Sequence, residues 1–398
     1  MNLIKQIRQG NCRDSLPMFF FSTVILLLVM FLLFIFFKYY FNSDNSSDFS
    51  STKTLVVDEP FSGQLYFNDE LGEKVFSPVI IEAISKAKKS AELAVYSMDD
   101  QGIRDALYRA SKRGVKVTMV LSDKRKDGHD QVLQNLPKEI KRIDAPSSEG
   151  YMHHKFLILD RGSNQEKLFF GSYNFTALQE KYDPSFLLET TRPEIVKIFG
   201  QEFDRLKNEV YGRKKLNSRQ IYLMTRIKYP EGFLEIWFSP QLSRGGLRER
   251  MLGLINNSKD NLKVMIWNFT SKSMALDIAD AAVRKSVRII ADDLNYSLPE
   301  SAFNTLLSEK GSRSLEKLEI ITDAKRNEEA IRLSGDKSLN SFLHHHLLLV
   351  DDRVAVFGSG NWSNNGFYSN DESTMISDIN ILVQPFIESW QKNYEHNK

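Results

Sequence analysis

The pattern of hydrophobic and polar positions divides the chain into one long apolar run and a remainder with helical or strand spacing. Residues 16–37 carry no charged side chain and are rich in Phe and Leu. About 20 such residues suffice to cross a bilayer as a helix, so the run predicts a transmembrane helix. A cleaved signal peptide would have a shorter apolar core ending in small residues, whereas this run ends in Phe36-Phe37.

The charges beside this run predict its orientation. Lys5, Arg8 and Arg13 precede it, whereas Lys38 is the one basic residue close behind it. Basic residues concentrate on the cytoplasmic side of membrane helices. We therefore expect residues 1–15 to be a cytoplasmic tail, and the protein to be a single-pass membrane protein whose bulk is non-cytoplasmic. Residues 38–63, rich in Asn, Ser and Asp at their start, are interpreted as a tether.

From residue 64 onward the pattern occurs twice. In the first copy, helical spacing over 78–89 and 102–113 alternates with short β-rich segments at 93–98 and 115–121. The second copy repeats this order with helices at 247–255 and 273–284 and strands at 262–267 and 287–291. Alternating strands and helices predict mainly parallel or mixed sheets covered on both faces. The first half is placed at 64–212, a charged connector at 213–234, and the second half at 235–398.

Each copy then continues with a hairpin of two apolar strands. These strands are expected at 156–159 and 168–170 in the first copy, and at 347–350 and 354–357 in the second. A helix closes each copy, at about 193–211 and about 383–394.

Composition changes this picture only slightly. The 398 residues include 42% hydrophobic and 26% charged residues, which is typical of a globular protein. A net charge of +2 argues against a uniformly basic nucleic-acid-binding surface. Cys12 is the only cysteine, which excludes an intrachain disulfide. The basic clusters at 124–126 and 213–215 are interpreted as solvated surface.

Five of the seven histidines form two clusters, and each cluster opens the first strand of a hairpin. The first cluster is His153-His154-Lys155, and the second is His344-His345-His346. Side chains alternate along a strand, so His153 and Lys155 should share one face while His154 points to the other. Each hairpin ends at a Gly-Ser-x-Asn turn. An imidazole beside an ammonium and neutral hydrogen-bond donors suits the binding and cleavage of a phosphodiester.

At these residues the chain resembles the phospholipase D superfamily. Its signature is His-x-Lys, four residues, then Asp, with Gly-Ser-x-Asn downstream, and the resemblance covers roughly residues 64–398. It implies an α/β fold, the pseudo-duplicated phospholipase D fold, in which two α/β/α layered halves with mixed sheets meet at one cleft. One histidine becomes phosphorylated, the other protonates the leaving oxygen, and neither a metal nor another cofactor takes part.

The resemblance implies a role for each matching residue. His153 would be the nucleophile and His344 the general acid. The phosphate would be held by Lys155, Ser172, Asn174, Ser359 and Asn361, with Asp160 and Asp351 as structural supports. Related nucleases carry an Asn-x-Glu-like element that orients a histidine. Glu372 occupies that place in the second copy, whereas the first copy has Asp183-Pro184-Ser185. The alternative for Glu372 is a solvated loop carboxylate.

His346 departs from the signature because it stands where the second lysine should be. A bound anion would raise the pKa of this imidazole, so an acidic optimum is expected. Two other interpretations stay open: zinc binding by the three adjacent histidines, and a non-catalytic phosphate-binding protein. The expected substrate is a phosphodiester, either a glycerophospholipid or a nucleic acid. A transphosphatidylase such as a cardiolipin synthase is the alternative to a hydrolase.

Overall fold

The computed structural model describes residues 52–122, 136–148, 150–217, 224–241 and 245–398. The predicted cytoplasmic tail, the transmembrane helix at 16–37, residues 38–51 of the tether and the basic cluster at 124–126 lie outside these ranges. Within the described ranges, none of the helices combines the length and the apolar character needed to cross a bilayer.

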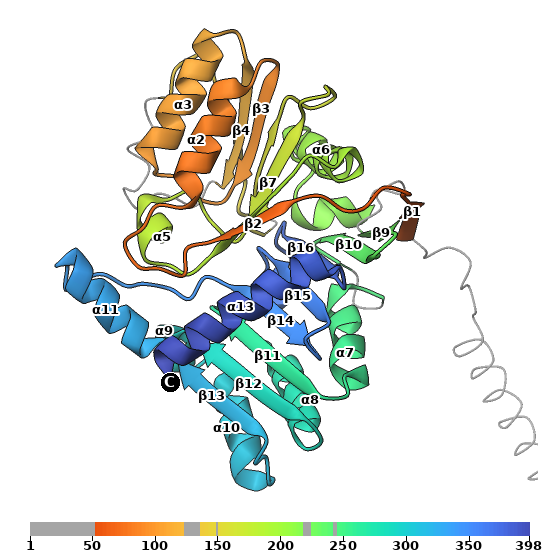
Figure 1. Cartoon of the computed structure of the whole chain (residues 1–398), viewed down its shortest axis with the longest axis vertical. Helices are drawn as coiled ribbons and strands as arrows, with labels where there is room; N and C mark the ends of the chain where they lie inside the picture. Colours follow the sequence, from red (N-terminus) through yellow and green to blue (C-terminus); the bar gives the residue numbers. More distant parts are fainter. Residues whose placement is uncertain (1–51, 123–135, 149, 218–223, 242–244) are drawn as a thin grey trace, which may run out of the picture. The chain divides into compact units, whose positions relative to one another are not determined.

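Two mixed sheets form the framework of the described chain (Figure 1). The first sheet has seven strands, and its three consecutive strands β3, β4 and β5 are parallel while the other pairs are antiparallel. In spatial order these strands are β2 (Gln64–Phe67), β8 (Phe186–Thr190), β7 (Lys167–Gly171), β6 (Lys155–Leu159), β3 (Ser90–Val95), β4 (Lys116–Ser122) and β5 (Lys141–Ala145).

The second sheet has nine strands and repeats this arrangement. Its strands, in spatial order, are β1 (Thr52–Val56), β9 (Met224–Tyr229), β10 (Gly232–Phe238), β16 (Ser373–Ser377), β15 (Val354–Gly358), β14 (His346–Val350), β11 (Asn261–Ile266), β12 (Ser286–Ala291) and β13 (Leu318–Thr322). The order from β10 to β13 is that of the first sheet from β2 to β5. The duplication expected from the sequence is therefore a duplication of topology.

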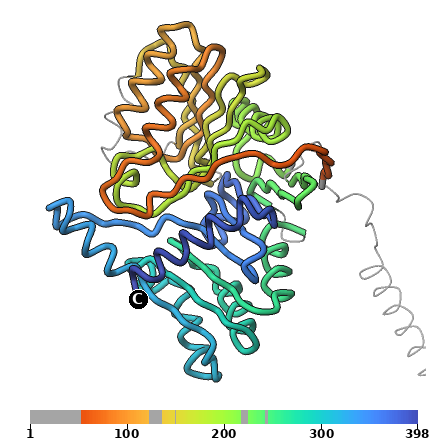
Figure 2. The backbone as a smooth tube through the Cα atoms, in the orientation of Figure 1, coloured from red at the N-terminus to blue at the C-terminus, as the bar shows by residue number. Residues whose placement is uncertain are grey.

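Two strands at one edge of the second sheet, β1 and β9, have no counterpart in the first sheet and were not predicted from the repeat. Strand β1 precedes the first half in sequence but pairs in parallel with β9, and Figure 2 shows the chain returning from there to β2. Strand β9 lies inside the predicted connector and pairs with β10. The interpretation of 213–234 as a simple connector was therefore wrong, because this segment supplies a strand to the second sheet.

Helices cover both faces of each sheet. The longer ones are α2 (Phe76–Lys86), α3 (Gln101–Lys112), α6 (Pro193–Lys207), α7 (Leu247–Asn257), α8 (Lys272–Ala282), α10 (Phe303–Ser312), α11 (Ala324–Ser334) and α13 (Asn380–Asn397). The short helices are α5 (Ala177–Lys181), the 3-10 helix η1 (Gly212–Asn217), α9 (Asp293–Tyr296) and α12 (Asn364–Tyr368). Neighbouring residues of β6 divide between two cores: Leu157 packs with α2 and α3, whereas Phe156 packs in a central core.

That central core joins the two halves. It contains side chains of α6 from the first half and of α13 from the second. The Phe186 ring of β8 lies 5.6 Å from the Phe357 ring of β15 and 5.1 Å from the Phe386 ring of α13. Burying large aromatic side chains stabilises an interface strongly. The expected mixed α/β fold with two sheets is confirmed, and its halves share one core.

Two aspartates of the motifs fix their hairpins. Asp160 and Asp351 follow β6 and β14 with φ of 51° and 55°, a left-handed conformation that Asp tolerates better than most residues. The Asp160 carboxylate accepts the backbone N–H groups of Lys88, Lys89 and Ser90. The Asp351 carboxylate accepts those of residues 259–261. Both aspartates thus tie a hairpin to the start of a neighbouring strand.

The glycines of the two Gly-Ser-x-Asn turns are required by close packing. A Cβ atom on Gly171 would lie 2.1 Å from the carbonyl oxygen of Phe186, and one on Gly358 would lie 2.2 Å from that of Ser373. No side chain fits at such a distance. Each turn is therefore pressed against the following strand, β8 or β16, at the edge where the histidines lie.

Candidate active site

The two histidine clusters meet at the junction of the halves. Lys155 and His346 are the first residues of β6 and β14, and His153 and His344 come just before these strands. The Asn174 Nδ2 atom lies 3.4 Å from the His344 Nε2 atom and so joins the first half to the second. All four histidine and lysine side chains are buried. The structure therefore brings both predicted motifs to one site.

His153 is held on both ring nitrogens. Its Nδ1 atom lies 2.8 Å from Oε2 of Glu372, which comes from the second half. Its Nε2 atom lies 3.2 Å from Nζ of Lys155, and that ammonium also donates to the His153 carbonyl oxygen at 2.8 Å. A carboxylate accepts hydrogen bonds and an ammonium donates them. The two contacts therefore favour the tautomer that carries hydrogen on Nδ1 and a lone pair on Nε2.

Glu372 is itself fixed by neutral donors. The Ser359 hydroxyl donates to Oε2 at 2.8 Å, and the Asn370 amide donates to Oε1 at 3.2 Å. Ser359 Oγ also accepts the backbone N–H of Ser373, just as Ser172 Oγ accepts that of Phe186. Both serines were predicted to hold phosphate. Here their oxygens bind the adjacent strands, and the Ser359 hydroxyl proton is directed to Glu372.

The second motif lacks a comparable carboxylate among the described residues. His344 Nδ1 and both ring nitrogens of His346 are buried without a hydrogen-bond partner there. Ser185 occupies the place that corresponds to Glu372, directly before β8, but its hydroxyl donates to the Asp183 carbonyl oxygen. The side-chain oxygens of Asn174 and Asn361 are also buried without partners in the described chain. The two motifs therefore share the same backbone arrangement but differ in the side chains that hydrogen-bond to their histidines.

Burial dominates the electrostatics of the first motif. It lowers the pKa of Lys155 to about 7, an effect that the Glu372 carboxylate partly offsets. It raises the pKa of Glu372 to about 7, against the opposing effects of Lys155, Ser359 and Asn370. Burial, followed by the charge of Lys155, lowers the pKa of His153 well below its ordinary value. Near neutral pH the His153 imidazole is therefore neutral.

Burial also dominates the electrostatics of His346. Burial and the nearby His344 and Lys155 lower the pKa of His346 well below its ordinary value. The upward shift expected when an anion binds stays a prediction. The neighbours with the largest effect on it in the described chain are Lys155 and the other histidines, and all of them disfavour its protonation. At neutral pH His346 offers the site a neutral ring.

The sequence model described as "Cardiolipin synthase, PLD-like domain" matches residues 80–207 and 251–394. These ranges include both motifs and more than half of the chain. The chain belongs to this phospholipase D-like family.

Individual relatives match parts of the chain. A protein named phospholipase D from Rickettsia conorii is 33% identical over 102 residues, which are 26% of this chain and 49% of that protein. A mitochondrial cardiolipin hydrolase from Mus musculus is 28% identical over 132 residues, which are 33% of this chain and 57% of that protein. The chain thus spans about half the length of the curated relatives it matches.

Two solved structures share the fold over most of the chain. Phosphatidylserine synthase from Haemophilus influenzae superposes with a TM-score of 0.55 and 17% identity, covering 85% of this chain and 88% of that chain. Polyphosphate kinase from Porphyromonas gingivalis superposes with a TM-score of 0.54 and 13% identity, covering 84% of this chain and 50% of that chain. At these identities the likeness shows the fold alone.

Aromatic side chains beside the histidines were not predicted as part of this phospholipase D-like site. The Tyr96 ring lies 4.8 Å from the His153 ring, and the Trp267 ring stacks 5.0 Å from the His344 ring. Tyr96 directly follows β3 and Trp267 directly follows β11. Their matching positions in the two copies are the sequence signal that could have placed them at the site.

The structure does not support a zinc site in the second cluster. The His345 ring lies 6.2 Å from each of the Phe67 and Phe186 rings, on the side of the central core. His344 and His346 instead lie beside Trp267. In the part of the chain that the structure describes, no group of three or more His, Cys, Asp or Glu side chains could hold a metal ion.

Proposed function

We propose that the protein is a phosphodiesterase that cleaves its substrate through a phosphohistidine formed on His153. The observation that carries this proposal is the hydrogen bonding of His153, with Glu372 at Nδ1 and Lys155 at Nε2. A neutral imidazole with its lone pair on Nε2 is the nucleophilic form. The lowered pKa of His153 favours this form near neutral pH.

In the proposed reaction, His153 Nε2 attacks phosphorus and the bond from phosphorus to the leaving oxygen breaks. His344, which would take up a proton as the anionic substrate binds, gives that proton to the leaving oxygen. Water then attacks phosphorus and gives one proton to His344, while the bond from phosphorus to His153 Nε2 breaks and releases the phosphate monoester and neutral His153. Glu372 balances the positive charge that develops on the His153 ring. Lys155 and Asn174 would stabilise the phosphate oxygens during both steps.

A phospholipid is the proposed substrate. The names of the Rickettsia and mouse relatives, phospholipase D and mitochondrial cardiolipin hydrolase, support this choice. Transfer to an alcohol is the second candidate, because the matching family is described as a cardiolipin synthase. Both reactions share the phosphohistidine and differ in whether water or an alcohol releases it. A nucleic-acid substrate would be an outcome of the test below.

We also propose that residues 16–37 anchor the protein in a membrane with the catalytic halves on the non-cytoplasmic side. The uncharged run and the basic residues before it support this arrangement. A reporter fused to the end of the chain should be active only outside the cytoplasm. A reporter active in the cytoplasm would contradict the proposed topology.

The experiment that tests the function compares substrates and variants of the full chain. Labelled cardiolipin, phosphatidylglycerol, single-stranded DNA and RNA would be incubated with wild type, His153→Ala and His344→Ala, with His396→Ala as an exposed control. We expect lipid turnover that His153→Ala abolishes. An acid-labile phosphoryl adduct should form with bis(p-nitrophenyl) phosphate in His344→Ala, because this leaving group needs no proton. An adduct that survives His153→Ala would refute the assignment of the nucleophile.

A further inference from the structure

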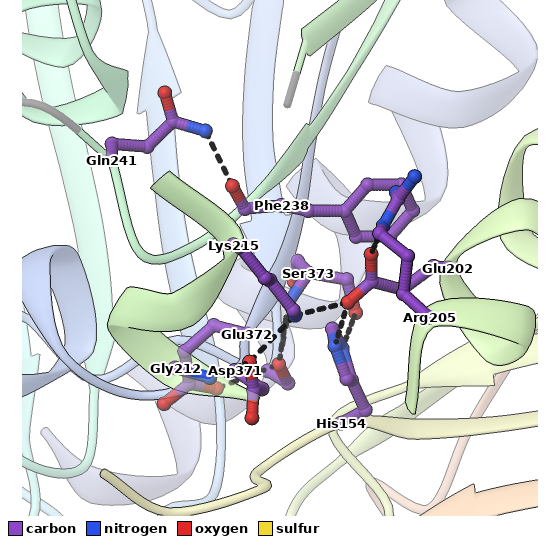
Figure 3. Close-up of polar contacts among 11 residues, drawn as sticks. His154, Glu202, Arg205, Gly212, Lys215, Phe238, Gln241, Asp371, Glu372 and Ser373 are labelled. Carbon is purple, nitrogen blue, oxygen red and sulfur yellow. Dashed lines mark hydrogen bonds and ion pairs between the residues drawn. The ribbon is translucent and has the colours of Figure 1, made fainter. Parts of the chain in front are cut away.

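Lys215 lies at the centre of a buried ionic network behind the first histidine cluster (Figure 3). Its side chain is fully buried, although the sequence suggested a solvated basic cluster at 213–215. The ammonium pairs with Glu202 of α6 and lies 2.6 Å from Oδ1 of Asp371, and both carboxylates are buried. An unpaired lysine in the interior would cost several kcal/mol. Lys215 is therefore held there by two anionic partners from different halves.

The network reaches the histidine cluster from its outer side. His154 Nε2 lies 3.0 Å from Oε1 of Glu202, and His154 Nδ1 lies 3.2 Å from the Ser373 hydroxyl. Arg205 donates to the other oxygen of Glu202 at 2.8 Å. The two residues that flank the catalytic pair in sequence, His154 beside His153 and Ser373 beside Glu372, are thus hydrogen-bonded to each other.

Asp371 connects this network to the backbone of the site. Its side chain accepts the Gly212 N–H at 2.8 Å as well as binding Lys215. Its carbonyl oxygen accepts the His153 N–H at 2.9 Å, and its own N–H donates to the Tyr151 carbonyl at 2.8 Å. Glu372 is the next residue. The position of Asp371 therefore fixes the distance between the Glu372 carboxylate and the His153 ring.

The second half shows that the fold itself does not require such a network. His345 corresponds to His154, but its ring packs against Phe67 and Phe186, and neither ring nitrogen has a hydrogen-bond partner in the described chain. Packing by aromatic rings is thus sufficient to build this strand. The ionic network occurs at the motif whose histidine binds a carboxylate.

We propose that Lys215 is a positioning residue: through Asp371 and Glu202 it holds Glu372 at hydrogen-bonding distance from His153 Nδ1. The inference rests on the proposed function. Lys215 does not contact the histidine itself, so its loss should lower kcat and leave KM nearly unchanged. Removing a group that supports a catalytic contact typically costs about 10- to 100-fold.

The test uses the full chain in detergent micelles and two variants that perturb the same ion pair. Lys215→Met removes the ammonium, and Asp371→Asn keeps a side-chain oxygen for Gly212 while removing the charge. Both should lower kcat by about 10- to 100-fold with KM within about twofold of wild type. Lys215→Arg, which keeps the positive charge that Lys215→Met removes, should retain most of the wild-type activity. Lys214→Met is the matched control, because this exposed neighbour lies in the same turn and should leave kcat unchanged.

A second readout reports the geometry independently of turnover. In protein with labelled histidine, the Nδ1–H of His153 should give a downfield proton resonance that Glu372→Gln removes. Lys215→Met and Asp371→Asn should shift or broaden this resonance, and Lys214→Met should not. Folded Lys215→Met and Asp371→Asn proteins with wild-type kcat and an unchanged resonance would overturn the inference, while the proposed function would stand if His153→Ala is inactive. A wild type without phosphodiesterase activity would overturn both.

Discussion

Replacement of Glu372 by glutamine tests the asymmetry of the site most directly. The Glu372 carboxylate accepts three side-chain hydrogen bonds: His153 and Ser359 at Oε2, and Asn370 at Oε1. Glutamine has the same shape but a single acceptor oxygen. If that oxygen accepts the hydrogen bond from His153, the NH2 group of the glutamine lies opposite the NH2 group of Asn370, and both groups are donors. Asn370 cannot rotate freely to resolve this conflict, because its oxygen accepts the Tyr151 N–H.

The magnitude follows from the loss of charge. A hydrogen bond to a charged group contributes about 1.5–3 kcal/mol, and His153 becomes cationic in the proposed transition state. Since 1.36 kcal/mol corresponds to a tenfold change in rate, Glu372→Gln should lower kcat about 10- to 150-fold. KM should change little, because the carboxylate lies on Nδ1, away from the attacking nitrogen. Ser185→Ala, at the corresponding position of the other half, should stay within about twofold of wild type.

The pH profile gives an independent check. Wild-type activity should fall as pH decreases through about 7, because Glu372 then gains a proton, and should fall again as Lys155 loses its proton above about 7. Glu372→Gln removes the group behind the acid limb. It also removes the negative charge that raises the pKa of Lys155, so the alkaline limb should move to lower pH. Rates of bis(p-nitrophenyl) phosphate hydrolysis between pH 5 and 9 would measure both limbs. An unchanged rate and profile in a folded variant would refute the role of Glu372.

Three further predictions follow from the described site and its surroundings. Activity should survive EDTA, and loss of activity that zinc restores would return the histidine cluster to a metal-binding role. His346→Lys should lower KM more at pH 6 than at pH 8, because burial should lower the pKa of a new lysine here as it does that of Lys155; equal effects at both values would indicate no phosphate contact. Burial raises the pKa of Asp183 to about 8, so this carboxyl favours the folded state only while protonated, and stability should fall as pH rises from about 4 to 8. In urea titrations Asp183→Asn, which can still accept the Phe342 N–H, should remove much of this fall.

The sequence predicted the repeated helices and strands within a few residues, because their apolar spacing is regular in both copies. The strands beginning at Phe186 and Ser373 were missed: they are short, buried on both faces and show no alternation. The strand at Met224–Tyr229 was missed because its charged residues alternate with apolar ones inside what reads as a linker. These segments become strands because they pair with strands distant in the sequence, and local residue spacing does not reveal such pairing.

The site was predictable as far as it depends on residues close in sequence. His153 and Lys155 share one face because strand alternation requires it, and the two histidine motifs meet because the fold is duplicated. The partners of Lys215 could not be predicted from spacing, because Glu202 lies 13 residues earlier on a separate helix and Asp371 comes from the other half. A basic triplet in a charged segment gives no sign that one of its members is buried.

The duplication and its breakdown together indicate how the two halves divide the proposed chemistry. Positions set by the backbone are retained in both copies: the hairpin aspartates with positive φ, and the turn glycines whose Cβ atoms would collide with a carbonyl. Positions that carry charge differ between the copies. Lys155 and Glu372 contact His153 in the first motif, whereas His346 stands at the position of Lys155 and Ser185 at the position of Glu372 in the other copy. A nucleophile that becomes cationic needs a fixed counterion. A residue that gives a proton to the leaving group and takes one from water needs a pKa that rises when the anionic substrate is bound. Burial and the charge of Lys155 lower the pKa of His344 well below its ordinary value, and no carboxylate in the described chain pairs with it, so it would gain its proton only when the anionic substrate raises that pKa.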